Sequence, residues 1–146
     1  MSIMTGCVAA SAPSLISWAG VDVSKKTFDA ALWLPLVKEQ VWPLKSLPYR
    51  RFERTIEGAA QFVAWLEEKA VGRDEHGGLL ARAVMEATGS FSEELARWLR
   101  QLRPELAPAI VNPRHTRAFI ESLAQRNKTD AVDARALARY GFERRP

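Results

Sequence analysis

The order of the hydrophobic segments is the feature that most restricts the fold of this chain of 146 residues. Two strand-like segments, residues 16–23 and 27–34, flank a short polar turn at residues 24–26, which predicts an antiparallel hairpin. Prolines interrupt the next stretch, so we expect residues 41–42 and 49–54 to be short edge-strand pieces. The chain therefore opens with a three-strand antiparallel meander.

Helices and strands alternate after the meander. Apolar spacing and the positions of Gly and Pro predict a helix at 55–70, a strand at 79–86, a second helix, a strand at 106–111, and helices at 113–124 and 129–140. The helix between the two strands is expected to be capped by Ser90 or Ser92 and to end at Pro104. Its apolar stripe is Leu95, Trp98, Leu99 and Leu102. The order β-β-β-α-β-α-β-α-α is typical of an α/β ribonuclease H-like fold with a mixed five-stranded sheet flanked by helices. A doubly wound domain would begin β-α-β.

The length suits one compact domain at residues 16–146, preceded by a loose or disordered tail at residues 1–15. The tail lacks the basic region of a signal peptide, and no apolar stretch reaches transmembrane length. The single cysteine, Cys7, excludes an internal disulfide and fits a cytoplasmic location. One cysteine and two histidines also argue against a structural zinc site.

Four carboxylates lie where this fold would direct them to one point: Asp22, Glu86, Asp130 and Asp133. Each alone has a local explanation, such as a turn cap, a solvated strand end or favourable charge in the first turn of a helix. Acidic side chains are costly to gather in a dry site unless a cation compensates them. Their joint placement therefore predicts a Mg²⁺ site, with Mn²⁺ as a substitute, that acts on phosphodiesters.

The net charge of +4 is unevenly distributed along the chain. Residues 1–96 carry 10 basic and 12 acidic groups, whereas residues 97–146 carry 11 basic and 5 acidic groups. The C-terminal third therefore either faces a polyanion or is simply a soluble surface. The candidates for contacts with nucleic-acid phosphates are Lys25, Arg114, Arg117, Arg126, Lys128 and Arg135. Trp65 and Trp98 lie on apolar helical stripes and are expected in the core rather than stacked on bases.

Several motifs resemble the N-terminal domain of the DEDD-type insertion-sequence transposases, which are recombinases guided by a bridge RNA. The motifs are GVDVSK at residues 20–25, EATG at 86–89, VNP at 111–113, KTDAVDA at 128–134 and RALARYG at 135–141. GVDVSK alone is a weak signal, but the motifs in this order are specific. The resemblance covers residues 16–142, which is nearly the whole chain.

The resemblance implies a RuvC-like ribonuclease H fold in which Asp22, Glu86, Asp130 and Asp133 bind magnesium and act in DNA cleavage and strand exchange during transposition. It also implies DNA and a structured bridge RNA as partners, a homo-oligomer, and a cytoplasmic, nucleoid-associated location without a membrane. In the family, a nucleophilic serine lies on a separate C-terminal domain, which is absent before the chain stops at Pro146. We therefore do not expect this chain alone to complete recombination.

Two other functions stay open from the sequence. The chain could be a nucleic-acid-binding module without turnover of its own, or a free-standing RuvC-like junction nuclease that needs no serine domain. The first of these would not be an enzyme, and the second would be one without any further domain. The sugar-kinase and actin-like ATPase fold also begins with a Gly-x-Asp strand, but the turn at residues 24–26 lacks the glycine that its phosphate loop requires.

Overall fold

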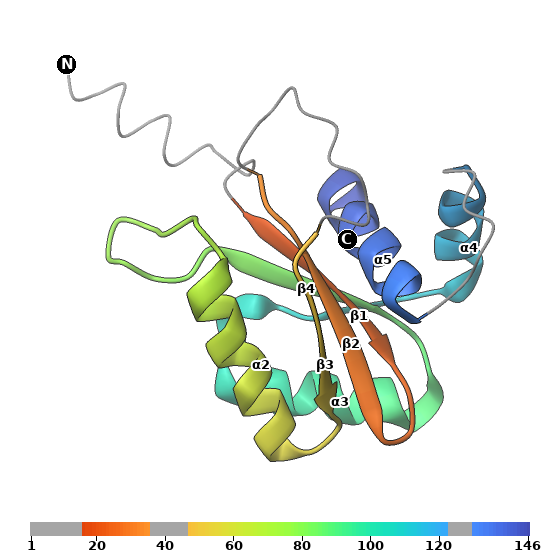
Figure 1. Cartoon of the computed structure of the whole chain (residues 1–146), viewed down its shortest axis with the longest axis horizontal. Coiled ribbons are helices and arrows are strands. Elements are labelled where there is room, and N and C mark those ends of the chain that lie inside the picture. Colours follow the sequence, from red (N-terminus) through yellow and green to blue (C-terminus); the bar gives the residue numbers. More distant parts are fainter. Residues whose placement is uncertain (1–15, 36–46, 123–129) are drawn as a thin grey trace.

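The computed structural model describes residues 16–35, 47–122 and 130–146, without the side chains of residues 130–133. The elements follow one another in the predicted order (Figure 1). They are β1 (Ser17–Val23), β2 (Thr27–Trp33), β3 (Tyr49–Glu53), α2 (Ile56–Lys69), β4 (Ala81–Glu86), α3 (Gly89–Leu102), the 3-10 helix η3 (Pro104–Leu106), β5 (Ala109–Val111), α4 (Pro113–Ser122) and α5 (Asp130–Arg144).

The strands form one five-stranded mixed sheet in the order β3-β2-β1-β4-β5. β2 pairs antiparallel with both β1 and β3, which confirms the meander, while β4 lies parallel to β1 and to β5. At the β1–β2 turn, the backbone N–H and the hydroxyl of Ser24 both donate to the carbonyl of Thr27 at 2.9 Å. The predicted ribonuclease H-like α/β fold is confirmed.

Helices cover both faces of the sheet, with α2 and α3 on one side and α4 and α5 on the other (Figure 1). Beneath α2, the rings of Phe28, Phe52, Phe62 and Trp65 pack with neighbouring centroids 5.3 to 6.2 Å apart. Trp65 therefore lies in the core as predicted. Aromatic pairs in these stacked and edge-to-face arrangements add to the stabilisation from burial.

The close approach of α5 to β1 depends on two glycines. A Cβ atom added to Gly20 would lie 2.2 Å from the carbonyl oxygen of Ala134 and 2.2 Å from the backbone nitrogen of Ala138. A Cβ atom on Gly141 would lie 2.6 Å from the ring of Trp18. Only glycine permits the backbone contact at Gly20 and the contact of Gly141 with the Trp18 ring, so these two residues fix the position of α5 on the sheet.

The predicted strand at residues 106–111 is wrong in its first half. Pro104 begins a 3-10 turn, and Ala107 adopts a left-handed conformation with φ of 41° before the strand starts at Ala109. Leu106 is fully buried in the core. Its apolar character therefore reflects packing of the turn and not a longer strand.

Two helices also differ from the prediction at their ends. α3 begins at Gly89, so Ser90 and Ser92 lie inside its first turn and neither residue is the N-cap. The Ser92 hydroxyl instead accepts a hydrogen bond from the Thr88 backbone N–H at 2.9 Å. Leu102, expected on the apolar stripe, is 40% exposed, and α5 continues four residues beyond the predicted end at residue 140.

Some of the expectations concern parts of the chain outside the described residues. These are the tail at residues 1–15, the strand piece at 41–42, the last two residues of the helix at 113–124, and Arg126 and Lys128. Among the described residues, no helix combines the length and the apolar character needed to cross a membrane.

We expect Gly20→Ala to lower the free energy of unfolding by about 3 kcal/mol or more, because the added methyl group would push α5 away from β1. Gly77→Ala is the control, since its Cβ would meet nothing within 4 Å and only its φ of 81° opposes the change, at about 1 kcal/mol. Urea unfolding followed by tryptophan fluorescence measures both values. Equal losses in the two variants would contradict the close contact.

Candidate functional site

Asp22 and Glu86 lie side by side at one edge of the sheet. Val21 of β1 pairs with Met85 of the parallel strand β4, so the next residue on each strand is one of the two acids. Side chains alternate between the faces of a strand, which places Asp22 on the same face as Gly20, the face that α5 covers. Both acids are partly buried. The structure thus brings together two of the four predicted carboxylates.

The first turn of α5 extends toward the same edge. Gly141, near the end of α5, contacts Trp18 near the start of β1, whereas Ala134 contacts Gly20 further along β1. The helix therefore runs opposite to β1, and its first residue, Asp130, lies beyond Gly20 in the direction of Asp22. The side chains of Asp130 and Asp133 lie outside the described part of the chain, so only their backbone position is established.

Glu86 is held from two sides. The Thr88 hydroxyl donates to the Glu86 carbonyl at 2.9 Å, and the N–H of the following residue, Ala87, donates to the Val111 carbonyl of β5 at 2.9 Å. The hydroxyl of Thr116 on α4 contacts the Glu86 carboxylate at Oε2. Thr116 was not among the residues predicted from the sequence. Its position three residues before an apolar residue of the same helix was a signal that it faces the core.

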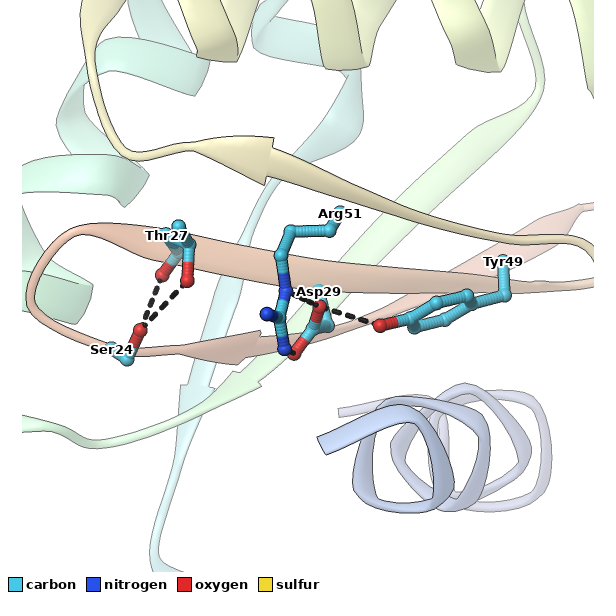
Figure 2. A network of polar contacts seen from close by, with 5 residues as sticks. All are labelled: Ser24, Thr27, Asp29, Tyr49 and Arg51. Carbon is cyan, nitrogen blue, oxygen red and sulfur yellow. Dashed lines mark hydrogen bonds and ion pairs between the residues drawn. The ribbon is translucent and has the colours of Figure 1, made fainter. Parts of the chain in front are cut away.

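Asp29 is an acid that was not among the residues predicted from the sequence. It pairs with Asp22 across the β1–β2 ladder and is only 2% exposed. Arg51 donates to its carboxylate at 2.7 and 3.1 Å, and the Tyr49 hydroxyl donates to it at 2.7 Å (Figure 2). Two negative charges directly opposite each other in a sheet, such as Asp22 and Asp29, are unfavourable. The positive charge of Arg51 compensates that of Asp29. Arg51 lies opposite Asp29 in the pairing of β2 with β3. The sequence could identify Arg51 as the partner of Asp29 only if the register of these two strands were known.

Arg135 connects this network to α5. Its guanidinium carbon lies 4.9 Å from the centre of the Tyr49 ring, an attractive cation–π arrangement. Its buried Nε has no hydrogen-bond partner among the described residues. The structure therefore places Arg135, a predicted nucleic-acid contact, against the edge strand next to Asp29.

The turn that carries Lys25 is fixed to α3. Arg54 donates through Nε to the Lys25 carbonyl at 2.8 Å, pairs with Glu94, and lies with its guanidinium carbon 4.6 Å from the centre of the Phe91 ring. The Lys25 side chain is exposed and follows Asp22 by three residues. The backbone of Lys25 is thus fixed at the end of β1 that carries Asp22, with its charged side chain in solvent.

Two other predicted nucleic-acid contacts, Arg114 and Arg117, lie exposed on α4. The helix begins just after β5, where the Asn112 side chain accepts a hydrogen bond from the Arg114 backbone N–H at 2.8 Å. The backbone N–H groups of Arg114 and His115 are both bonded to Asn112, so it is the charge of the two exposed arginines that favours an anion here.

A group of ionisable residues also lies in the loop between α2 and β4, at the opposite end of β4 from Glu86. Hydrogen bonds from the backbone N–H groups of Gly78 and His76 lower the pKa of Asp74 below its usual value. This arrangement is typical of a side chain that closes a turn, so Asp74 is a structural residue.

The residues at the edge formed by β1 and β4 suit a hard divalent cation. Carboxylate oxygens are the ligands that Mg²⁺ prefers, and Asp22 and Glu86 offer them from a rigid sheet. Among the described side chains, no group of three or more His, Cys, Asp or Glu residues is arranged to hold a metal ion. The pair would therefore need further ligands, and α5, whose first turn carries Asp130 and Asp133, begins toward the same end of the two strands.

Comparison with known proteins identifies one family. The sequence profile of a family described as transposase, of the DEDD type named after IS110, matches residues 19–146. Proteins named pilin gene-inverting protein from Moraxella lacunata and Moraxella bovis are each 29% identical over 130 residues. The alignment covers 89% of this chain and 35% of each relative, so the chain spans about a third of the length of the curated relatives that it matches.

A solved structure of the Aquifex aeolicus PPX-GPPA enzyme is similar to this chain, with a TM-score of 0.45 and 12% sequence identity. The match covers 77% of this chain and 42% of that one.

We expect Arg51→Met to lower the free energy of unfolding by about 2 kcal/mol, because Asp29 would stay buried without its cation. The Arg51 side chain is 52% exposed, which limits the loss. Arg50→Met is the matched control, since Arg50 is exposed on the same strand and lies over the Phe52 ring. Chemical denaturation compares the two, and an equal effect of both changes would show that Asp29 does not depend on Arg51.

Proposed function

The chain belongs to the IS110 type of the DEDD transposase family, and we propose that it is the metal-binding, RuvC-like domain of a DNA recombinase. In this proposal Asp22, Glu86, Asp130 and Asp133 hold Mg²⁺, or Mn²⁺ in its place, for DNA cleavage and strand exchange. The observation that supports it is the pairing of β1 with β4, which sets Asp22 beside Glu86 at the edge toward which α5 begins.

In the proposed site, two acids come from the strands β1 and β4, and two come from the helix α5 that covers them. Asp22 and Glu86 bind from neighbouring strands, so their backbones keep a constant separation. The first turn of α5 would add the two other acids from the helix that covers this face of the sheet. Bound Mg²⁺ would supply Lewis-acid stabilisation of the charge that develops on the phosphate. The exposed Lys25 would orient the DNA backbone beside the acids.

The match covers only 35% of each relative, so we propose that complete recombination needs a further region. By resemblance, that region would supply a nucleophilic serine. The name pilin gene-inverting protein supports a role in rearranging DNA. We further propose DNA and a structured bridge RNA as partners, assembly of several copies, and a cytoplasmic location close to the nucleoid.

A nucleic-acid-binding module without turnover is the second candidate. The exposed Arg114 and Arg117 on α4 favour it, because they are cations on a helix that packs on the same face of the sheet as α5. The two candidates differ in whether the carboxylates bind metal.

We expect this chain to bind Mn²⁺, and Asp22→Asn or Glu86→Gln to weaken binding by about 100-fold or more because each removes a ligand oxygen. Glu57→Gln is the control, an exposed acid in the first turn of α2 on the other face of the sheet. Calorimetric titration measures affinity, and circular dichroism confirms that each variant is folded. Wild-type affinity in both site variants would refute the metal site and leave the binding module.

We expect affinity for DNA to fall steeply with salt, and Arg117→Ala to weaken it at every DNA sequence because the contact is to phosphate. The slope of log affinity against log salt should decrease by about one unit. Lys69→Ala removes the same charge from α2, on the other face of the sheet, and should leave the slope unchanged. Fluorescence anisotropy at several salt concentrations tests this, and equal slopes in both variants would rule out α4 as the contact surface.

A further inference from the structure

Thr116 is a polar residue on the buried side of α4. It is 0% exposed, and its neighbours on that side of the helix are Phe119 and Ile120. A valine would have nearly the same shape there and would carry no hydroxyl that must be satisfied. A buried hydroxyl without a hydrogen-bond partner costs about 1 to 3 kcal/mol of stability. The hydrogen-bond partner of the Thr116 hydroxyl therefore indicates why a threonine is present at this position.

The hydroxyl of Thr116 has two acceptors within reach and only one proton. One acceptor is the Pro113 carbonyl in the preceding turn, at 3.0 Å from the threonine oxygen. The other is Oε2 of Glu86. Hydrogen bonds to a charged acceptor are about twice as strong as those between neutral groups, so the carboxylate is the preferred partner.

The backbone keeps Thr116 at a fixed place relative to Glu86. Glu86 pairs with Val111 across the parallel strands β4 and β5, and α4 starts two residues later. Asn112 secures this start by accepting the Arg114 N–H. The Glu86 side chain has three rotatable bonds of its own and ends a strand, so an outside contact is needed to hold its carboxylate still.

We propose that Thr116 is a positioning residue for the metal site. Its hydroxyl holds Oε2 of Glu86 and leaves the other oxygen, Oε1, to a divalent cation shared with Asp22. This inference rests on the proposed function. Partners that orient metal ligands in this way strengthen metal affinity about 10- to 100-fold.

The test compares Thr116→Val, which keeps the shape, with Thr116→Ser, which keeps the hydroxyl, in the 146-residue chain. Calorimetry with Mn²⁺ should show about 10- to 100-fold weaker binding for the valine variant and no more than about a threefold change for the serine variant. In the Glu86→Gln background, Thr116→Val should add no further loss of Mn²⁺ affinity, since the carboxylate that Thr116 would position is already replaced. The ¹³C resonance of the Glu86 carboxylate should move in the valine variant without metal and stay in place in the serine variant.

The outcomes separate this role from the proposed function. If the wild-type chain binds Mn²⁺ and the folded valine variant binds it equally well, the role of Thr116 is overturned and the metal site is not. Wild-type chain that binds no Mn²⁺ would overturn the metal site and this role with it. Thermal unfolding in EDTA checks that the variants fold. If the valine variant does not, Thr116→Cys replaces it, because a thiol is a weak donor and should give the same loss.

Discussion

The contact between Gly20 on the central strand and the backbone of α5 determines the rest of the site. Without a side chain at Gly20, the carbonyl of Ala134 and the nitrogen of Ala138 approach the strand directly. That approach fixes the height and direction of α5 above the sheet. Because Asp22 lies two residues beyond Gly20, the same contact determines how far the start of α5 is from the paired acids.

Polar side chains support the two acids from either side of the sheet's centre. On the β2 side, Arg51 and Tyr49 satisfy Asp29, so the residue opposite Asp22 brings no uncompensated charge. On the β5 side, Thr116 contacts Glu86. Asp22 and Glu86 thus each have a polar neighbour whose own position is fixed by hydrogen bonds.

The element order was predictable from the sequence because alternating and helical apolar patterns are local properties. The pairing of Asp22 with Glu86 followed from that order, since parallel strands present their carboxyl ends at one edge. Asp29 and Thr116 were not predictable in the same way. Their partners depend on strand register and on the rotation of α4, which local patterns leave undetermined. The 3-10 turn before β5 escaped prediction because Leu106 is apolar whether it lies in a strand or in a buried turn.

The packing of the last helix against the first strand also has a consequence for synthesis. β1 leaves the ribosome more than a hundred residues before α5, so the face of β1 that α5 covers stays open until α5 has been made. Joining segments so distant in the chain is slow. The nascent polypeptide therefore brings the start of α5 toward Asp22 and Glu86 only after that helix has emerged.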